Sequence, residues 1–188
     1  SATDDSEAPC QANSGKDVYY SFAATCDGTL TLTTEGSSQS DTVLSATAGC
    51  GGASLGCDDD SGTGNLSAIA PFSVILGQEV RIRVASFGAA CGGFNLNITL
   101  ICSPPVACCK SDGSCTEEFP SVCLAQDGVP GIVGSTCTPN TCPQPGACCQ
   151  GPPYSCSQLL ASACGAAGGA FLGEGASCLN FLGQSACD

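Results

Sequence analysis

The chain has 188 residues, of which 18 are cysteine and none is histidine. Seventeen acidic residues against four basic ones give a net charge of -13. Such a surface repels phosphate groups, which excludes nucleic acid as a partner and disfavours anionic lipid, whereas it attracts divalent cations. No run of about 18 apolar residues is present, so no membrane span is expected.

The N-terminus, SATDDSEAPC, lacks Met, a basic stretch and an apolar run. We interpret it as a mature end from which a signal peptide has been removed, which predicts a secreted protein. Asp4, Asp5 and Glu7 are expected to form a solvated tail, or a strand that contributes ligands across an interface.

Residues 1–102 contain short runs rich in Val, Ile, Thr, Tyr and Phe, separated by Gly, Asp and Ser. Their spacing predicts an all-β fold, an antiparallel β-sandwich. The expected strands are DVYYSFAAT, TLTLTTEG, DTVLSATAG, LSAIAPFSVILG, EVRIRVASFG and FNLNITLI.

Alternation within these runs predicts which side chains face the core. Arg81 and Arg83 are expected to point to solvent or to an interface. The side chains expected to point inward are Val18, Tyr20, Phe22, Ile82, Val84, Phe94, Leu96, Ile98 and Leu100.

The loop CDDDSGTGN is acidic and contains glycine. Calcium takes about six to eight oxygen ligands, and such a loop supplies several within a short stretch, although its spacing is not that of an EF-hand. Asp58, Asp59 and Asp60, with Asp41 upstream, are therefore candidate calcium ligands. The alternative of a solvated charged loop without an ion stays open, because runs of like charge are commonly solvated.

The segments DVYYSFAATCDGTLTLTT, SDTVLSATAGC, LGCDDD and VRIRVASFG follow one another in the chain. Over about residues 15–101 they resemble the bacterial pre-peptidase C-terminal domain. The resemblance implies a jelly-roll-like β-sandwich, a non-catalytic accessory role and, in some members, calcium binding.

A tandem repeat follows the sandwich. Cys108-Cys109 opens one set of six cysteines and Cys148-Cys149 opens the next, forty positions later. We predict two Cys-rich units of little regular structure, residues 103–142 and 143–188, in which EEFPSVC and SQLLASAC form a helical turn or two. The openings ACCKSDGSC and ACCQGPPYSC resemble a short repeat of secreted bacterial proteins, for which no function is implied.

The cysteines are expected to be paired in disulfides. Zinc sites typically contain Cys-x2-Cys with His, and this chain has neither. The spacing leaves the connectivity open, although Cys50 and Cys57, flanking GGASLG, are a candidate local bridge. Such cysteine usage predicts an oxidising, extracellular setting. The cysteines are Cys10, Cys26, Cys50, Cys57, Cys91, Cys102, Cys108, Cys109, Cys115, Cys123, Cys137, Cys142, Cys148, Cys149, Cys156, Cys164, Cys178 and Cys187.

Two further features bear on chemistry. Asn65 and Asn97 lie in the sequons NLS and NIT and are glycosylation candidates. Without His, and with the cysteines expected to be oxidised, no activated nucleophile can be assembled, and consecutive Asp residues on an extended strand alternate between its faces. We therefore expect no enzymatic activity and no organic cofactor.

Only 11% of the residues are charged, whereas 43% are apolar. Such a surface is expected to be covered by sugar or buried against copies of the same chain. We therefore predict a secreted structural subunit that self-assembles into an extracellular filament, sheath or matrix, strengthened by disulfides, with calcium as an option. The alternatives are an adhesion module for a surface glycan or protein, and a small inhibitor or toxin. The absence of Trp argues against a carbohydrate-binding platform.

Overall fold

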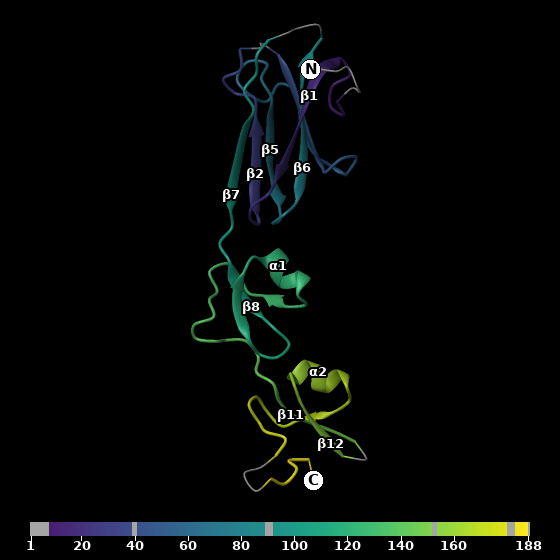
Figure 1. The fold of residues 1–188 in the computed structure, drawn as a ribbon, viewed down its shortest axis with the longest axis vertical. Coiled ribbons are helices and arrows are strands. Elements are labelled where there is room, and N and C mark those ends of the chain that lie inside the picture. Colours follow the sequence, from purple (N-terminus) through teal and green to yellow (C-terminus); the bar gives the residue numbers. More distant parts are fainter. Residues whose placement is uncertain (1–7, 39–40, 89–91, 152–153, 180–182, 188) are drawn as a thin grey trace. The chain divides into compact units, whose positions relative to one another are not determined.

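A computed structural model of the protein describes residues 8–38, 41–88, 92–151, 154–179 and 183–187. The chain divides into two compact units, Ser1–Ser103 and Pro104–Asp188. Figure 1 follows the strands of the first unit into the smaller elements of the second. The expectation of an all-β, disulfide-rich fold is confirmed.

The first unit consists of two antiparallel sheets. One has four strands in the order β1-β6-β3-β4, and the other has three in the order β5-β2-β7. The strands β2, β5 and β7 lie side by side in Figure 1. The bounds are β1 Ser14–Ala23, β2 Gly28–Thr33, β3 Thr42–Ala48, β4 Ser54–Asp58, β5 Ala68–Val74, β6 Glu79–Phe87 and β7 Asn97–Cys102.

The hydrophobic core lies between the two sheets. Leu30 and Leu32 of β2 belong to one buried cluster with Leu44 of β3 and Ile82 of β6, and all four are fully buried. Burying such a side chain stabilises the fold by about 1.5–3 kcal/mol. Alternating apolar residues on strands from both sheets therefore hold the sandwich together.

Most of the predicted inward side chains do face this core. Two of them are substantially exposed, namely Ile98 by 37% and Tyr20 by 40%. Ile98 lies on β7, an edge strand paired only with β2 among the described residues, and Tyr20 meets the ring of Phe94 edge to face at 6.2 Å. Side chains on edge strands keep solvent access that the alternation alone does not reveal.

The prediction that Arg83 points to solvent or an interface is wrong. Arg83 is 5% exposed, and its Nε lies 2.6 Å from Asp17 Oδ2. A turn beginning at Ala8 covers part of the outer face of the four-stranded sheet, where Ala8 packs against Val43 and Ala85. The guanidinium also donates to Ser14, so Arg83 is buried beneath the chain that leads into β1.

Strand β4 was not predicted from the sequence. Its five residues, SLGCD, do not alternate between apolar and polar, and it pairs with β3 across an irregularity between Ala46 and Thr47. Gly56 sits so close to Ile69 Cγ2 that a Cβ atom at this position would overlap it. The strand therefore needs a glycine where propensity favours a β-branched residue.

The second unit contains two small repeats built alike. Each has a three-stranded sheet and a short helix, so the predicted helical turns are confirmed, whereas the strands are an addition to the prediction. In the first repeat the elements are β8 Val106–Cys109, β9 Cys115–Glu118, α1 Pro120–Ala125 and β10 Val129–Pro130. In the second they are β11 Gly146–Gln150, β12 Ser155–Leu159, α2 Ala161–Ala166 and β13 Ala170–Phe171.

The disulfides have one connectivity in both repeats. The first cysteine of each set bonds to the fourth, the second to the sixth and the third to the fifth. The pairs are Cys108–Cys123, Cys109–Cys142, Cys115–Cys137, Cys148–Cys164, Cys149–Cys187 and Cys156–Cys178. The adjacent cysteines thus reach different partners, as expected.

The local bridge between Cys50 and Cys57 is not formed. Cys57 bonds to Cys10, and Cys26 bonds to Cys102. Strand β4 places Cys57 opposite Ser45, beneath the turn that carries Cys10, whereas Cys50 lies in the β3–β4 connection as an exposed free thiol. The expectation that Cys50 is oxidised is therefore wrong, and Cys91 lies outside the described residues.

Candidate metal centre

Three of the four candidate calcium ligands converge at one end of the four-stranded sheet. Asp41 directly precedes β3, and Asp59 and Asp60 directly follow β4. Because β3 and β4 are antiparallel neighbours, the start of one lies beside the end of the other. One oxygen from each of the three carboxylates lies within 4.8 Å of those of the other two.

A buried network of hydroxyl groups fixes the backbone beneath these carboxylates. Thr34 Oγ1 and Thr42 Oγ1 share a hydrogen bond of 2.7 Å, and both accept the backbone N–H of Ser67. Ser67 Oγ in turn lies 3.1 Å from the backbone oxygen of Asp59. Thr34, Thr42 and Ser67 are each fully buried, so the network ties the acidic loop to the sandwich.

Neighbouring amides orient two of the carboxylates. Gln11 Nε2 donates to Asp59 Oδ2 at 2.5 Å, and Asn65 Nδ2 donates to Asp41 Oδ2 at 3.4 Å. Asp59 Oδ1 is enclosed by protein atoms and accepts no hydrogen bond from the described residues. A buried carboxylate oxygen is costly unless a donor or a cation balances it.

Partial desolvation and then the neighbouring carboxylates raise the pKa of Asp60. Its pKa lies above the ordinary value of 3.8, first because of partial desolvation and then because Asp59, Asp41 and Asp58 place negative charge nearby. Mutual repulsion of this kind is relieved by a proton or by a bound cation. The acidic side chains thus concentrate negative charge at this end of the sheet.

Asp58 has a different position from the other three. Its Oδ2 accepts the backbone N–H groups of Ser61 and Ala68, at 3.1 and 2.7 Å, and it is not among the three converging carboxylates. Asp58 thus shapes the loop. Asp4, Asp5 and Glu7 lie outside the described residues.

The donor set fits calcium. It consists of oxygen alone, which hard cations such as calcium prefer. Sequence reasoning missed Gln11 and Asn65, which orient the carboxylates. Gln11 is far away in the chain, so no local pattern signals its contact with Asp59.

A second group with metal-like spacing belongs to disulfides. One sulfur each of Cys149, Cys156 and Cys187 lies within 4.8 Å of the others. All three are oxidised, in the bonds Cys149–Cys187 and Cys156–Cys178. Thiolates are the form that binds zinc, so this group is a pair of neighbouring bridges.

Both sequon asparagines are exposed. Asn97 Nδ2 donates to the backbone oxygen of Glu35 at 2.9 Å, and Asn65 Nδ2 donates to Asp41. Ser67, the third residue of the first sequon, is fully buried in the hydroxyl network. A glycan on Asn65 would thus stand beside the acidic cluster.

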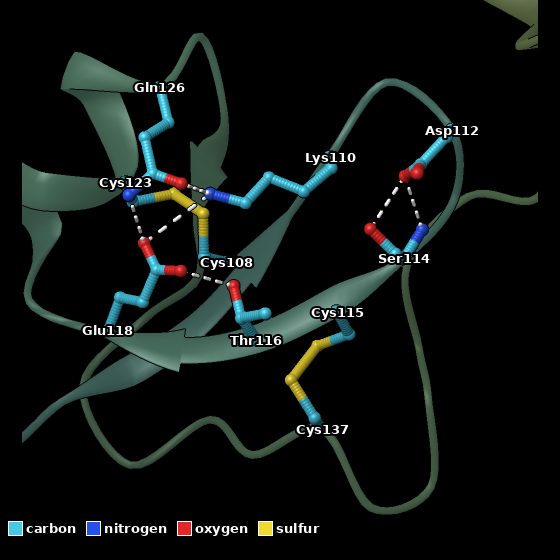
Figure 2. Close-up of polar contacts among 10 residues, drawn as sticks. All are labelled: Cys108, Lys110, Asp112, Ser114, Cys115, Thr116, Glu118, Cys123, Gln126 and Cys137. Atoms are coloured by element: carbon cyan, nitrogen blue, oxygen red, sulfur yellow. Dashed lines mark hydrogen bonds and ion pairs between the residues drawn. A yellow bond between two sulfur atoms is a disulfide. The ribbon is translucent and has the colours of Figure 1, made fainter.

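A separate polar cluster lies in the first repeat (Figure 2). Lys110 Nζ lies 3.4 Å from Glu118 Oε2 and donates to Gln126 Oε1 at 2.9 Å. The hydroxyl of Thr116, and then Lys110, hold the pKa of Glu118 below its ordinary value of 4.5. The Ser114 hydroxyl and backbone N–H likewise lower the pKa of Asp112. These groups satisfy one another, which is the pattern of a structural cluster.

Comparison of the chain with family models, with curated proteins and with solved structures finds no match. The resemblance to the pre-peptidase C-terminal domain therefore stays a prediction. Within the described ranges, no helix has the length and apolarity needed to cross a membrane. The disulfides of both units are those of a protein from an oxidising, extracellular type of environment.

Proposed function

We propose that this protein is a secreted, non-catalytic structural subunit that assembles with copies of itself outside the cell, and that its sandwich is strengthened by calcium. The assembly part depends on one observation, the exposure of large apolar side chains in a chain with few charges. The calcium part depends on the converging carboxylates of Asp41, Asp59 and Asp60.

The first repeat displays four such side chains within ten positions. Leu124, Val129, Ile132 and Val133 are exposed by 61%, 69%, 83% and 76%. Single exposed apolar residues are ordinary, but a concentration of them on a small unit is typical of surfaces that bind another protein. Burial against a second copy would remove these side chains from water, which supports self-assembly.

Calcium is supported by the enclosed oxygen of Asp59. This oxygen accepts no hydrogen bond from the described residues. The carboxylates of Asp41 and Asp60 approach that of Asp59 and add negative charge. A divalent ion would offset most of the negative charge of the three carboxylates, and the buried network of Thr34, Thr42 and Ser67 holds the loop in place beforehand. Such preorganisation lowers the cost of ordering ligands around an ion.

Assembly is tested with the oxidised, full-length protein by sedimentation and electron microscopy over a range of concentrations. We expect polymers, and we expect Ile132→Asp to shift the distribution towards monomers because it places a charge in the apolar surface. Ser111→Asp, which adds the same charge at an exposed polar site of the same repeat, is the control. Dispersed monomers at every concentration would refute the assembly proposal.

Calcium binding is tested separately, by thermal unfolding at neutral pH after chelation and after calcium is restored. A ligand that binds only the folded state adds about 2.7 kcal/mol at a hundred times its dissociation constant. We expect calcium to raise the melting temperature of the sandwich, and Asp59→Asn to abolish the rise. The control Asp127→Asn removes an exposed carboxylate from the other unit. An unchanged melting temperature would contradict the calcium site alone.

A further inference from the structure

The edge strands of the sandwich differ in how well they are protected. An edge strand presents unpaired backbone N–H and C=O groups, which native proteins shield with charges, proline or bulges. The edge strands here are β1, β4, β5 and β7. Strand β1 carries Lys16 at an irregularity in its pairing with β6, and β5 contains Pro71. Strand β4 ends at Asp58 and pairs irregularly with β3, so each of these three edges hinders the addition of another strand.

The remaining edge strand, β7, has none of these features. Its residues, Asn97–Cys102, include no charge and no proline, and its register with β2 is unbroken. Ile101 is 66% exposed, and Thr99 is exposed as well. Among the described residues β7 pairs only with β2, beside which it lies in Figure 1. Every second residue of such a strand directs its N–H and C=O away from the neighbouring strand, so β7 can accept another one.

The charge distribution favours a second copy of the same strand as the occupant. The chain has a net charge of -13, so two copies repel each other wherever their carboxylates approach. The three-stranded sheet carries no charged residue on β2, β5 or β7. Two copies can therefore meet along β7 without opposing like charges, and each contributes apolar side chains to the contact.

We propose that β7 pairs antiparallel with β7 of a second copy about a two-fold axis, so that the two three-stranded sheets become one. The inference rests on the self-assembly proposed above and names a surface for it. Addition of a strand to an exposed sheet edge is a common mode of protein recognition, in which main-chain hydrogen bonds provide the affinity. A two-fold contact closes on itself, so it joins copies in pairs and is one of the contacts that an assembly needs.

The alternation of side chains restricts the register of this pairing. A slip by one residue would turn the side chains of one copy to the opposite face, away from the shared core side. The registers that avoid this and use most of the strand place the axis beside Thr99 or beside Leu100. Ile98 then lies opposite Leu100 or Cys102 of the second copy. In both registers the exposed part of Ile98 gains an apolar neighbour, and no charged residue is enclosed.

Thr99 is the position that tests the contact, because it is exposed and close to the axis in both registers. The two Thr99 side chains are then opposite or diagonal neighbours, within about 8 Å of each other. Thr99→Lys and Thr99→Glu therefore each bring two like charges together. The dissociation constant is measured by sedimentation of the oxidised, full-length protein. The host must lack N-glycosylation, because Thr99 completes the sequon of Asn97.

We expect each variant alone to associate at least about tenfold more weakly than the unaltered protein, which corresponds to about 1.4 kcal/mol. An equimolar mixture of the two should restore association, because opposite charges then face each other across the axis. Ser73→Lys and Ser73→Glu are the matched controls. Ser73 is exposed on β5, the other edge of the same sheet, where it lies opposite Thr29. Both controls should associate as the unaltered protein does.

Hydrogen exchange of the unaltered protein provides a measurement that needs no variant. Exchange of the amides of residues 97–102 should slow as the protein concentration rises. If the protein assembles but these amides exchange at the same rate throughout, or if the mixture associates no better than either variant alone, the β7 contact is overturned and self-assembly stands. Monomers at every concentration would overturn both.

Discussion

The sandwich and the Cys-rich repeats keep their shape by different means. In the sandwich, two sheets enclose a cluster of buried Leu, Ile and Val side chains, and two disulfides are added. In each repeat, a large share of the buried side chains are cysteines, including Cys108, Cys123, Cys148 and Cys164. Units of about forty residues bury too little apolar surface to fold by hydrophobic burial alone, so disulfides supply the remaining stability.

Comparison of the two repeats separates the features that both share from those found in one alone. Both share the disulfide connectivity and equivalent backbone hydrogen bonds, such as Ala107 N–H to Ser135 and Ala147 N–H to Ala176. The polar cluster around Lys110 is not shared, since the second repeat has Gln150 after its cysteine pair. The sulfur framework is thus the constant part, and surface contacts vary upon it.

Reduction of the disulfides should have the largest effect, and it should affect the two units differently. Each repeat loses three bridges, each of which contributes about 2–4 kcal/mol, whereas the sandwich retains its apolar core. We expect a strong reductant to unfold Pro104–Asp188 and to leave the sandwich folded. Hydrogen exchange with mass spectrometry reports on both units in one sample. Equal loss of protection in the two would show that the sandwich also depends on its bridges.

Loss of the buried ion pair between Arg83 and Asp17 should destabilise the sandwich and leave the repeats unaffected. Arg83→Met leaves Asp17 charged without its partner, which we expect to cost about 3–5 kcal/mol in the free energy of unfolding. Replacing both residues, in Asp17→Leu/Arg83→Met, should recover much of that loss. Denaturant unfolding followed by hydrogen exchange measures the effect, and an unaffected sandwich in the single variant would contradict it.

Substitution of Gly128 or Gly169 should destabilise the repeat that contains it and leave the sandwich unaffected. A Cβ atom on Gly128 would lie 2.5 Å from Cys108 Sγ, and one on Gly169 would lie 2.5 Å from Cys148 Sγ. We expect Gly128→Ala or Gly169→Ala to destabilise its repeat by about 1–3 kcal/mol through overpacking. Gly165→Ala is the matched control: it has open space within α2 and should stabilise by about 1 kcal/mol. Thermal unfolding of the oxidised protein distinguishes the two signs.

Acidification should have the smallest effects on stability, and these should have opposite signs in the sandwich and in the first repeat. Because the folded sandwich raises the pKa of Asp60, the calcium-free sandwich should gain stability as the pH falls through that raised value, levelling off below 3.8. Because the first repeat lowers the pKa of Glu118, its contribution is complete above 4.5 and is lost as the pH falls through the lowered value.

The measurement is hydrogen exchange in each region between neutral pH and pH 3, without calcium and at constant ionic strength. Asp60→Asn should remove the gain in the sandwich, and Glu118→Gln should remove the loss in the first repeat. If both regions gained stability on acidification, or if both lost it, net charge would outweigh these local contacts.

The sequence by itself determined the class of fold, most of its strands and the repeat. Alternating apolar residues are a local signal, because successive side chains of a strand point to opposite faces. Cysteine spacing is local as well, and it identified two related units. The run of Asp residues indicated an acidic loop of oxygen ligands, and Asp41, Asp59 and Asp60 do converge in one cluster.

Only the tertiary structure decided which groups meet across the chain. Burial of Arg83 against Asp17, pairing of Cys57 with Cys10 and the free thiol of Cys50 all follow from the turn at Ala8, which covers the outer face of a sheet. Contacts between residues so distant in sequence leave no periodic signal. They arise because closing the sandwich fixes which strands are neighbours, and the neighbours then determine whether a side chain finds a partner or water.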